Sequence, residues 1–209
     1  MKLIFATGNK GKLREARDIL GPGYEIVTPR DLDPEFEDPE ETGTSFRENS
    51  IIKAKAVWDR FHLPCFADDS GLEIAALGGE PGVYSARYAG ENKDFECNID
   101  KVLDKLSQAS LAGNQDRSAC FHCTVTLITG ASCGNDALSD CDIHCFDGIL
   151  EGSIAARRRG TLGFGYDPVF IPAAIPDHTF GELGEDVKNQ FSHRQQALKA
   201  MVEYLNHTI

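Results

Sequence analysis

The chain has 209 residues, of which 41% are hydrophobic and 26% are charged, and its formal net charge is −12. This hydrophobic content excludes an intrinsically disordered chain, and the acidic balance is the opposite of the basic stripe that binds duplex nucleic acid. No apolar run approaches the ~18 residues that cross a bilayer, and the N-terminal apolar stretch is too short for a signal peptide. We therefore expect a single domain, residues 1–209, that works in the cytoplasm without a membrane or a nucleic-acid polymer as partner.

Short strands and amphipathic helices alternate along the chain. The expected strands are apolar runs bounded by turn residues, and they lie at residues 2–7, 25–28, 65–69, 118–129 and 141–150. Helices are expected at residues 12–20, 45–61, 94–108 and 192–207. The first and the last carry apolar residues at helical spacing, and the second opens on a capping-box pattern, Ser45-x-x-Glu48. Residues 30–43 and 71–90 read mainly as loop, and residues 160–170 as a turn followed by a strand. Since the two late strands are neighbours in sequence, the pattern predicts an α/β fold with a mixed sheet.

The seven cysteines predict no disulfide framework, since their number is odd and the chain is expected in the cytoplasm. Cys120–Cys123 and Cys141–Cys145 each include a histidine and look like half of a zinc site. However, both clusters lie in expected strands, where positions i and i+3 point to opposite faces. We therefore favour buried thiols over a structural zinc site.

A glycine-rich turn directly follows the first expected strand and opens the first expected helix. Backbone N–H groups at such a turn can bind a phosphate, glycine allows close approach, and a lysine adds charge. The spacing is not that of a P-loop, and a plain surface turn with lysines is the alternative. The residues concerned are Thr7, Gly8, Asn9, Lys10, Gly11 and Lys12.

Carboxylates gather in two further motifs. Glu41 precedes a helix that carries Lys53, and the adjacent Asp68 and Asp69 end the apolar strand 65–69. Mg²⁺ prefers carboxylate oxygens and keeps several waters, and a carboxylate beside such a water can accept its proton. Each motif by itself could therefore hold Mg²⁺, and Lys53 could reach a phosphate from the helix after Glu41. The alternatives are a solvated acidic surface at Glu41 and a turn or helix cap at the aspartates.

Two motifs in the last quarter of the chain suit a purine base. Phe164 lies between glycines, where its ring can stack on a base, and Asp167 can accept a hydrogen bond from a ring N–H. Lys188 is followed by His193 and Arg194 at a helix start, which suits an anion or a carbonyl. The alternatives are a turn plugged by an aromatic ring and a serine-capped helix with surface bases.

Together these motifs resemble the inosine triphosphate pyrophosphatase family, in order and through nearly the whole chain. The matching segments are ATGNKGKLREA, EETGTSFRENSIIKAKA, ADDSGLEIAALGGEPGVYSARYAG, FHCTVTL, GTLGFGYDPVF and KNQFSHRQQAL. The resemblance implies hydrolysis of the non-standard purine nucleoside triphosphates ITP, dITP and XTP to the monophosphate and pyrophosphate, with Mg²⁺ as cofactor. It also implies a homodimer and an elongated α/β fold, in which a long twisted mixed sheet is flanked by helices and two lobes enclose a central cleft.

The resemblance also implies a role for each motif. Glu41 and Asp69 would hold Mg²⁺, and Asp69 would accept the proton of the water that attacks the α-phosphorus. Lys53 and the turn Thr7–Lys12 would bind the triphosphate, and Ser70 would contact the substrate. The implied base pocket consists of Phe164, Gly165, Tyr166, Asp167, Lys188, His193 and Arg194.

Some features stand apart from the resemblance. Leu162 occupies a position where relatives often carry glycine, and neither the basic run Arg157–Arg159 nor the cysteine-rich stretch Cys133–Cys145 has a function predictable from sequence. Three other functions remain open: a pyrophosphatase for modified pyrimidine or methylated nucleotides, a nucleotide-binding regulator without catalysis, and a zinc-binding interaction module. Glu41 and Asp69 together favour catalysis over the regulator, because binding alone needs fewer carboxylates near phosphate.

Overall fold

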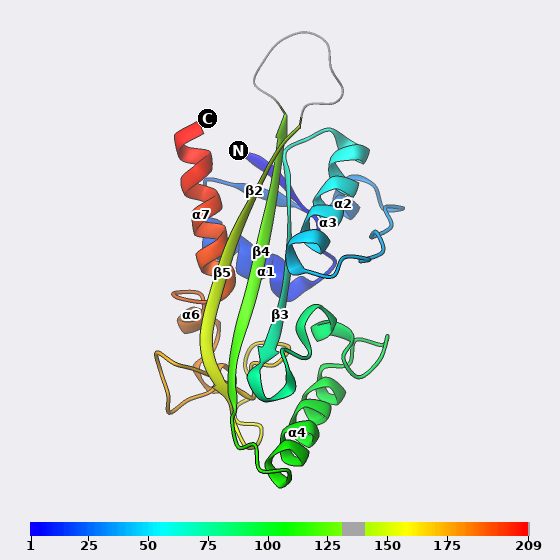
Figure 1. Cartoon of the computed structure of the whole chain (residues 1–209). Coiled ribbons are helices and arrows are strands. Elements are labelled where there is room, and N and C mark those ends of the chain that lie inside the picture. Colours follow the sequence, from blue (N-terminus) through cyan, green and yellow to red (C-terminus); the bar gives the residue numbers. More distant parts are fainter. Residues whose placement is uncertain (131–140, 209) are drawn as a thin grey trace. The chain divides into compact units, whose positions relative to one another are not determined.

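The protein is described by a computed structural model that covers residues 1–130 and 141–208. Its strands are β1 (Lys2–Phe5), β2 (Glu25–Val27), β3 (Cys65–Ile74), β4 (Ser118–Gly130), β5 (Cys141–Ile154) and β6 (Phe170–Pro172). Over the described residues they form one sheet in the order β2-β1-β3-β4-β5-β6. β1 pairs in parallel with β2 and β3, whereas β5 pairs antiparallel with β6. The predicted α/β fold with a mixed sheet flanked by helices is therefore confirmed (Figure 1).

The four long helices all lie where the sequence predicts them. They are α1 (Lys10–Leu20), α3 (Phe46–Phe61), α4 (Phe95–Leu111) and α7 (His193–Thr208). The short helices are α2 (Pro29–Leu32), α5 (Phe180–Leu183) and α6 (Glu185–Lys188), with 3-10 turns η1 (Ala75–Leu77) and η2 (Gly82–Arg87). Four-residue helices such as α2 are too short for periodicity to show. α2 depends instead on a capping box, in which Asp31 accepts hydrogen bonds from the backbone and hydroxyl of Thr28.

The chain folds into two compact units. Unit 1 comprises Met1–Asp69, Thr124–Asp147 and Arg194–Ile209, and unit 2 comprises Ser70–Cys123 and Gly148–His193. The expected cleft between two lobes and the assignment of one domain stay predictions.

Unit 1 has an apolar core between its strands and α3. Ile4 of β1, Val57 of α3 and Ile128 of β4 pack in one cluster and are almost fully buried. α1 begins at Lys10 because the Asn9 side chain accepts from the N–H groups of its first turn, and α3 begins after Ser45 for the same reason. In Figure 1, α7 lies to the left of strands β3–β5 of this unit and α3 lies to the right.

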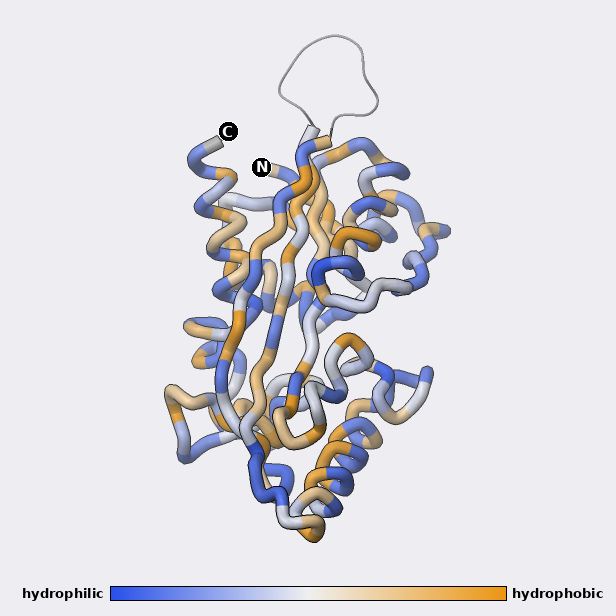
Figure 2. The backbone as a smooth tube through the Cα atoms, viewed as in Figure 1, coloured by the Kyte–Doolittle hydropathy of each residue, from blue (hydrophilic) through white to orange (hydrophobic). Residues whose placement is uncertain are grey.

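Unit 2 has a core of its own around α4. Ile99, Val102 and Leu106 form the buried face of this helix and pack with Phe121 and Phe170. Figure 2 shows the alternation of orange and blue around α4 that one buried and one solvated face require. Aromatic rings also contribute to this core, and Phe170 stacks on Phe180 with 5.6 Å between ring centroids.

Strand β3 corrects one prediction. It was expected to end at Asp69 with a loop after it, but it continues through Ser70 and Gly71 to Ile74. Serine and glycine disfavour strands on their own, but pairing within the sheet overrides that weak preference. Asp68 and Asp69 therefore lie in the middle of a buried strand, not at its exit. β5 is likewise longer than expected and ends at Ile154.

The described cysteines are free thiols, and no disulfide joins them. Cys133 lies outside the described residues, as does most of the cysteine-rich stretch. Among the residues that the structure describes, no group of three or more His, Cys, Asp or Glu side chains is arranged to hold a metal ion.

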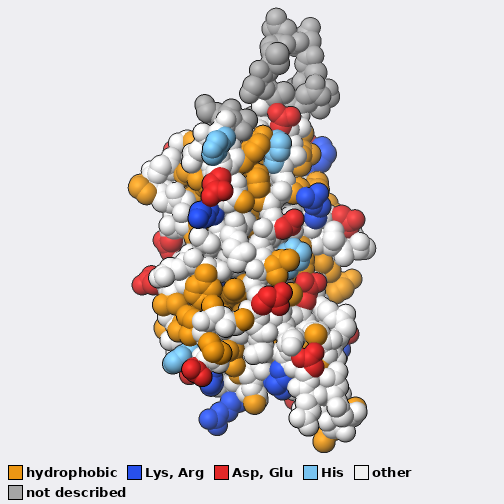
Figure 3. All heavy atoms as spheres, turned by 60° about the vertical axis from the view of Figure 1, so that its left-hand side comes forward, with side chains coloured by type: hydrophobic (Ala, Val, Ile, Leu, Met, Phe, Trp, Pro, Cys, Tyr) orange, Lys and Arg blue, Asp and Glu red, His pale blue; other side chains and the backbone are white. Residues whose placement is uncertain are grey.

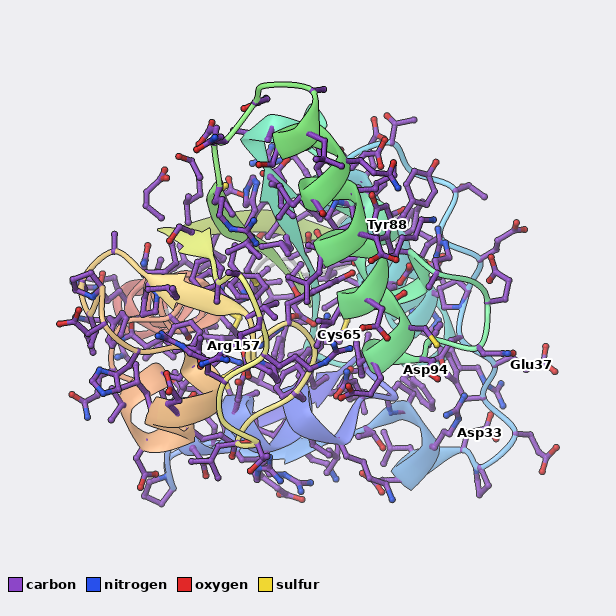
Figure 4. The ribbon with its side chains drawn as sticks, turned by 90° about the horizontal axis from the view of Figure 1, so that it is seen from below. Asp33, Glu37, Cys65, Tyr88, Asp94 and Arg157 are labelled. Atoms are coloured by element: carbon purple, nitrogen blue, oxygen red, sulfur yellow. The ribbon has the colours of Figure 1, made fainter. Side chains whose placement is uncertain are left out.

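No helix in the described ranges is long and apolar enough to cross a membrane. On the face shown in Figure 3, lysine and arginine side chains are scattered among acidic and hydrophobic ones. The acidic segment after α2 is solvated, and Figure 4 shows Glu37 at its outer edge.

Candidate functional site

The two adjacent aspartates of β3 point in opposite directions. Successive side chains of a strand alternate between the faces of the sheet, so Asp68 and Asp69 meet different helices. Asp68 contacts Lys12 of α1 and Arg194 of α7, whereas Asp69 contacts Lys53 of α3. Each aspartate is the centre of a separate charged cluster in unit 1.

The first cluster, Lys12, Glu15, Asp68 and Arg194, is a buried ion-pair network. Lys12 Nζ donates to Asp68 Oδ1 at 3.1 Å, and Arg194 Nε donates to Asp68 Oδ2 at 2.9 Å. Arg194 Nη1 also pairs with Glu15, which is fully buried. Burial alone would raise the pKa of Asp68, but the charges of Lys12 and Arg194 hold it well below its usual range. Asp68 is therefore an ionised structural anchor.

The second cluster contains Glu41, Asn49, Lys53 and Asp69. Lys53 Nζ lies 2.8 Å from Asp69 Oδ1 and 3.0 Å from Glu41 Oε1, so the two carboxylates converge on one cation. Burial lowers the pKa of Lys53, but the charges of Asp69 and Glu41 outweigh it and raise that pKa overall. Burial raises the pKa of Asp69, with Lys53 opposing the shift.

Asn49 connects Asp69 to the segment that carries Glu41. Its Nδ2 donates to Asp69 Oδ2 at 3.4 Å, and its Oδ1 accepts from the Gly43 N–H at 2.8 Å. A Cβ on Gly43 would lie 2.6 Å from the Cβ of Glu48 and 2.7 Å from Asn49 Oδ1. Only glycine fits at this point, which accounts for the glycine two residues after Glu41.

This second cluster fits a magnesium ion by the chemistry of its donors. The two carboxylates that meet on the Lys53 ammonium group supply the hard oxygen donors that Mg²⁺ prefers, and Mg²⁺ is commonly held by one or two carboxylates together with substrate phosphates. A third protein ligand is not required, since phosphate and water oxygens complete the octahedron.

The turn Thr7–Lys12 lies at the C-terminal end of β1. Asn9 Oδ1 accepts from the N–H groups of Gly11 at 2.8 Å and Lys12 at 3.2 Å, and the Asn9 N–H donates to Thr7 Oγ1. The N–H groups of Gly11 and Lys12, which would bind a phosphate at this turn, therefore donate to the Asn9 side chain instead. Lys12 is shared with the first cluster, because its ammonium group lies on Asp68.

In unit 2, the turn Gly163–Asp167 encloses a second buried ion pair. Asp167 Oδ2 accepts from the Phe164 N–H at 2.9 Å and from Lys188 Nζ at 2.8 Å, and both charged residues are at most 3% exposed. The Lys188 ammonium also lies 4.4 Å from the centroid of the Phe164 ring. One cation therefore fixes both the carboxylate and the aromatic ring of the turn.

Two other predicted base contacts have structural partners in unit 2. The Tyr166 hydroxyl donates to the Ser85 carbonyl at 2.8 Å, and burial raises the pKa of Tyr166. The His193 ring stacks on Phe121 with centroids 4.7 Å apart. Ser70 begins the unit-2 part of β3 and is half-buried. Arg194 contacts the first cluster in unit 1, so its assignment to the base stays a prediction.

The sequence of this chain is similar to known proteins over nearly its whole length. A sequence model of the Ham1 family matches residues 3–204. The chain belongs to the Ham1 family. A dITP/XTP pyrophosphatase of Halalkalibacterium halodurans is 45% identical over 206 residues, covering 97% of this chain and 98% of the relative. A dITP/XTP pyrophosphatase of Staphylococcus aureus is 39% identical over 204 residues, covering 98% and 96%. The predicted family resemblance is thereby confirmed.

Solved Ham1 structures have the same fold. A HAM1 protein from Coxiella burnetii superposes with a TM-score of 0.83 at 38% identity, and the Staphylococcus aureus Ham1 protein with 0.80 at 38%. Both alignments cover 100% of each chain.

Asp68 was grouped with Asp69 as a candidate magnesium carboxylate, but the structure places it in the buried ion-pair network with Lys12 and Arg194. Two further residues of this Ham1 site, Glu15 and Asn49, were not among the sequence predictions. Helical spacing is the signal that could have found them. Glu15 lies three residues after Lys12 in α1, and Asn49 lies four residues before Lys53 in α3, so each shares a helix face with a predicted residue.

Replacing Gly163 with alanine is expected to destabilise the turn of this Ham1 protein by about 1–3 kcal/mol. Gly163 has φ +79, and a Cβ there would lie 2.2 Å from Asp167 Oδ2. Gly78→Ala is the matched control, because Gly78 has φ +65 with nothing within 4 Å of its added Cβ. The free energies of unfolding in urea give the comparison. If both variants lose the same free energy of unfolding, the Asp167 carboxylate moves away from the added Cβ without destabilising the turn.

Proposed function

We propose that this protein hydrolyses the non-standard purine nucleoside triphosphates dITP, XTP and ITP to the monophosphate and pyrophosphate. The observation that carries the proposal is the convergence of Asp69 and Glu41 on Lys53, which assembles a proton acceptor, a cation site and a phosphate-binding lysine. The names of the relatives, dITP/XTP pyrophosphatases at 45% and 39% identity, support the substrate class. Hydrolysis would remove these nucleotides from the pool.

The charged side chains of unit 1 account for binding of the triphosphate. Lys12 and Lys53 each carry an ammonium group that lies on a carboxylate in this structure, and both can move to phosphate oxygens through rotation of a flexible stem. The turn between β1 and α1 adds backbone N–H groups at a helix N-terminus, once the Asn9 side chain releases them.

Asp69 is the residue that would accept a proton. It is 7% exposed, and Lys53 and Asn49 fix both of its oxygens. In the proposed reaction, Asp69 accepts the proton of a water that attacks the α-phosphorus, and pyrophosphate leaves. When bound by Glu41 and Asp69, Mg²⁺ would neutralise phosphate charge as the leaving group separates. Positioning and charge supply most of the catalysis in phosphate chemistry of this kind.

The turn in unit 2 would supply the choice of base. The Phe164 ring offers a flat apolar surface for stacking, and the buried pair of Asp167 and Lys188 offers an acceptor and a donor. A site built for a 6-keto purine leaves buried groups without partners when adenine enters. Such mismatches can change kcat/KM by several orders of magnitude.

Pyrophosphate release from a panel of nucleotides tests this function. The panel is dITP, XTP, ITP, GTP, ATP and dTTP, each with Mg²⁺ at alkaline pH. We expect the first three to be hydrolysed far faster than the others. Preference for dTTP would support the related pyrophosphatase instead, and no release from any nucleotide would support a non-catalytic regulator. Metal analysis of the purified protein tests the zinc-binding module.

Replacing Glu41 with glutamine is expected to raise the Mg²⁺ concentration needed for half-maximal rate by about tenfold or more. The amide keeps the size of the side chain but removes the charge that a hard cation prefers. Titration of Mg²⁺ by calorimetry should show the same weakening without turnover. Glu40→Gln is the matched control, because Glu40 is an exposed neighbour in the same segment. If both variants behave alike, Glu41 is not a ligand.

We also propose that the enzyme acts in the cytoplasm as a homodimer. The family resemblance of the whole chain supports the dimer, and the nucleotide pool on which it would act supports the compartment. Light scattering after size exclusion gives the mass of the particle directly. A mass of one chain, 22.9 kDa, at micromolar concentration would reject the dimer.

A further inference from the structure

The basic run Arg157–Arg159 adjoins the turn that carries the proposed base contacts. It follows β5 and begins the loop that leads to Gly163–Asp167. Backbone hydrogen bonds join the two ends of this loop. The Arg159 N–H donates to the Pro168 carbonyl at 2.8 Å, and the Ala155 N–H donates to the Val169 carbonyl at 2.7 Å. Bonds made by Arg158 therefore hold the closed end of the loop that carries the turn Gly163–Asp167.

Arg158 is bound to the N-terminal part of α4. Its Nε donates to Glu96 Oε2 at 3.0 Å, its Nη1 to Asp100 Oδ1 at 2.7 Å and its Nη2 to the Glu96 carbonyl at 2.8 Å. All three guanidinium nitrogens are thus used on one helix, one turn apart. Such multiple, planar bonding fixes direction better than a single ion pair does.

The same end of α4 also supports the turn from its inner side. The Phe95 ring lies 3.8 Å from the place that a Cβ on Gly165 would occupy. The Ser85 carbonyl accepts from the Tyr166 hydroxyl at 2.8 Å and from Asn98 Nδ2 of α4 at 3.4 Å. The turn therefore lies beside Phe95 of α4 at Gly165 and is linked to α4 through the Ser85 carbonyl, and the bonds of Arg158 fasten the start of its loop to the same helix.

We propose that Arg158 is a positioning residue for the purine base, because it fastens the loop that carries Phe164 and Asp167 to α4. The inference rests on the proposed function. It assigns a role to an arginine that is not among the predicted contacts with the nucleotide. In this role Arg158 acts through the loop, by its bonds with Glu96 and Asp100, and not by binding the base or the phosphates itself. It holds Phe164 in place for stacking, so its loss weakens recognition of the base and leaves the charged clusters of unit 1 intact.

The test compares Arg158→Gln with Arg157→Gln, a neighbouring arginine that is exposed. For each variant, kcat and KM are measured with dITP, together with the inhibition constant of inorganic triphosphate, which has no base. We expect Arg158→Gln to raise the KM for dITP by about fivefold, with kcat and the triphosphate inhibition constant within about twofold of the unaltered chain. Arg157→Gln should change none of these.

A second variant separates positioning from loss of charge. Arg158→Glu combined with Asp100→Arg reverses one ion pair and should restore most of the KM that Arg158→Glu alone loses. Equal KM values in Arg158→Gln and Arg157→Gln would overturn the inference. So would a parallel rise in the KM and in the triphosphate inhibition constant, since that pattern indicates general destabilisation. If the unaltered chain does not hydrolyse dITP, the proposed function itself is wrong. That result differs from the two outcomes above, which concern only the variants.

Discussion

Replacing Asp69 with asparagine is expected to lower kcat by about 10³-fold while nucleotide binding stays measurable. Asparagine has the shape of aspartate, so it fits the buried position in β3 and can still accept from Lys53 through its carbonyl oxygen. It cannot accept a proton from water at neutral pH. The change therefore removes the proposed proton transfer and leaves most of the surrounding structure in place.

Asp68→Asn is the informative comparison, because the two aspartates are adjacent and point to opposite faces. Asp68 binds Lys12 and Arg194, so its replacement should lower the free energy of unfolding more than Asp69→Asn does. Equilibrium binding of dITP, turnover and urea unfolding are measured for both variants. An Asp69→Asn protein with kcat within about tenfold of the unaltered chain would falsify the assignment of the proton acceptor.

The sequence predicts the architecture of this protein because the relevant signals are local. Apolar residues at helical spacing indicate α1 and α7, and the adjacency of β4 and β5 in sequence indicates a mixed sheet. The cap of α3 is also local, since Ser45 caps the Glu48 N–H as the capping-box pattern predicts. The Glu48 carboxylate also accepts from the N–H and hydroxyl of Thr44.

The end of β3 could not be predicted in this way. Ser70 and Gly71 look like the start of a turn, and nothing local shows that the sheet continues through them. The Leu72 N–H donates to the Ser85 hydroxyl at 2.8 Å, and Glu73 forms a bridge with Pro81. These partners come from a later segment that the sequence presents as loop.

Pairing of charges across the chain is equally invisible in the sequence. The motifs place Lys53, Asp69 and Glu41 near one another only by resemblance, and they associate Arg194 with the base. In the structure Arg194 pairs with Glu15, although 179 positions separate the two residues. A helix of alternating charges offers no sign that one glutamate in it is fully buried.

Replacing Arg194 with methionine is expected to lower the free energy of unfolding by about 3–5 kcal/mol. Arg194 is 2% exposed, and its guanidinium group binds both Asp68 and Glu15. Methionine fills much of the same volume but leaves two buried carboxylates with less positive charge, although Lys12 still lies beside Asp68. The loss of stability arises mainly from the buried negative charges of Asp68 and Glu15 and not from a cavity.

Two further variants distinguish this cause from a general effect of removing an arginine. Arg60→Met breaks a doubly bonded pair with Asp33 at the surface, where solvent screens the charges, and should have a far smaller effect. Adding Glu15→Gln to Arg194→Met removes one stranded charge and should restore at least about 1 kcal/mol, as expected for residues that couple directly. The readout is urea unfolding, because Arg194 is also a predicted base contact and turnover would mix the two roles. A double variant no more stable than Arg194→Met would show that Glu15 becomes protonated or solvated at little cost, and that the buried network contributes mainly through Asp68.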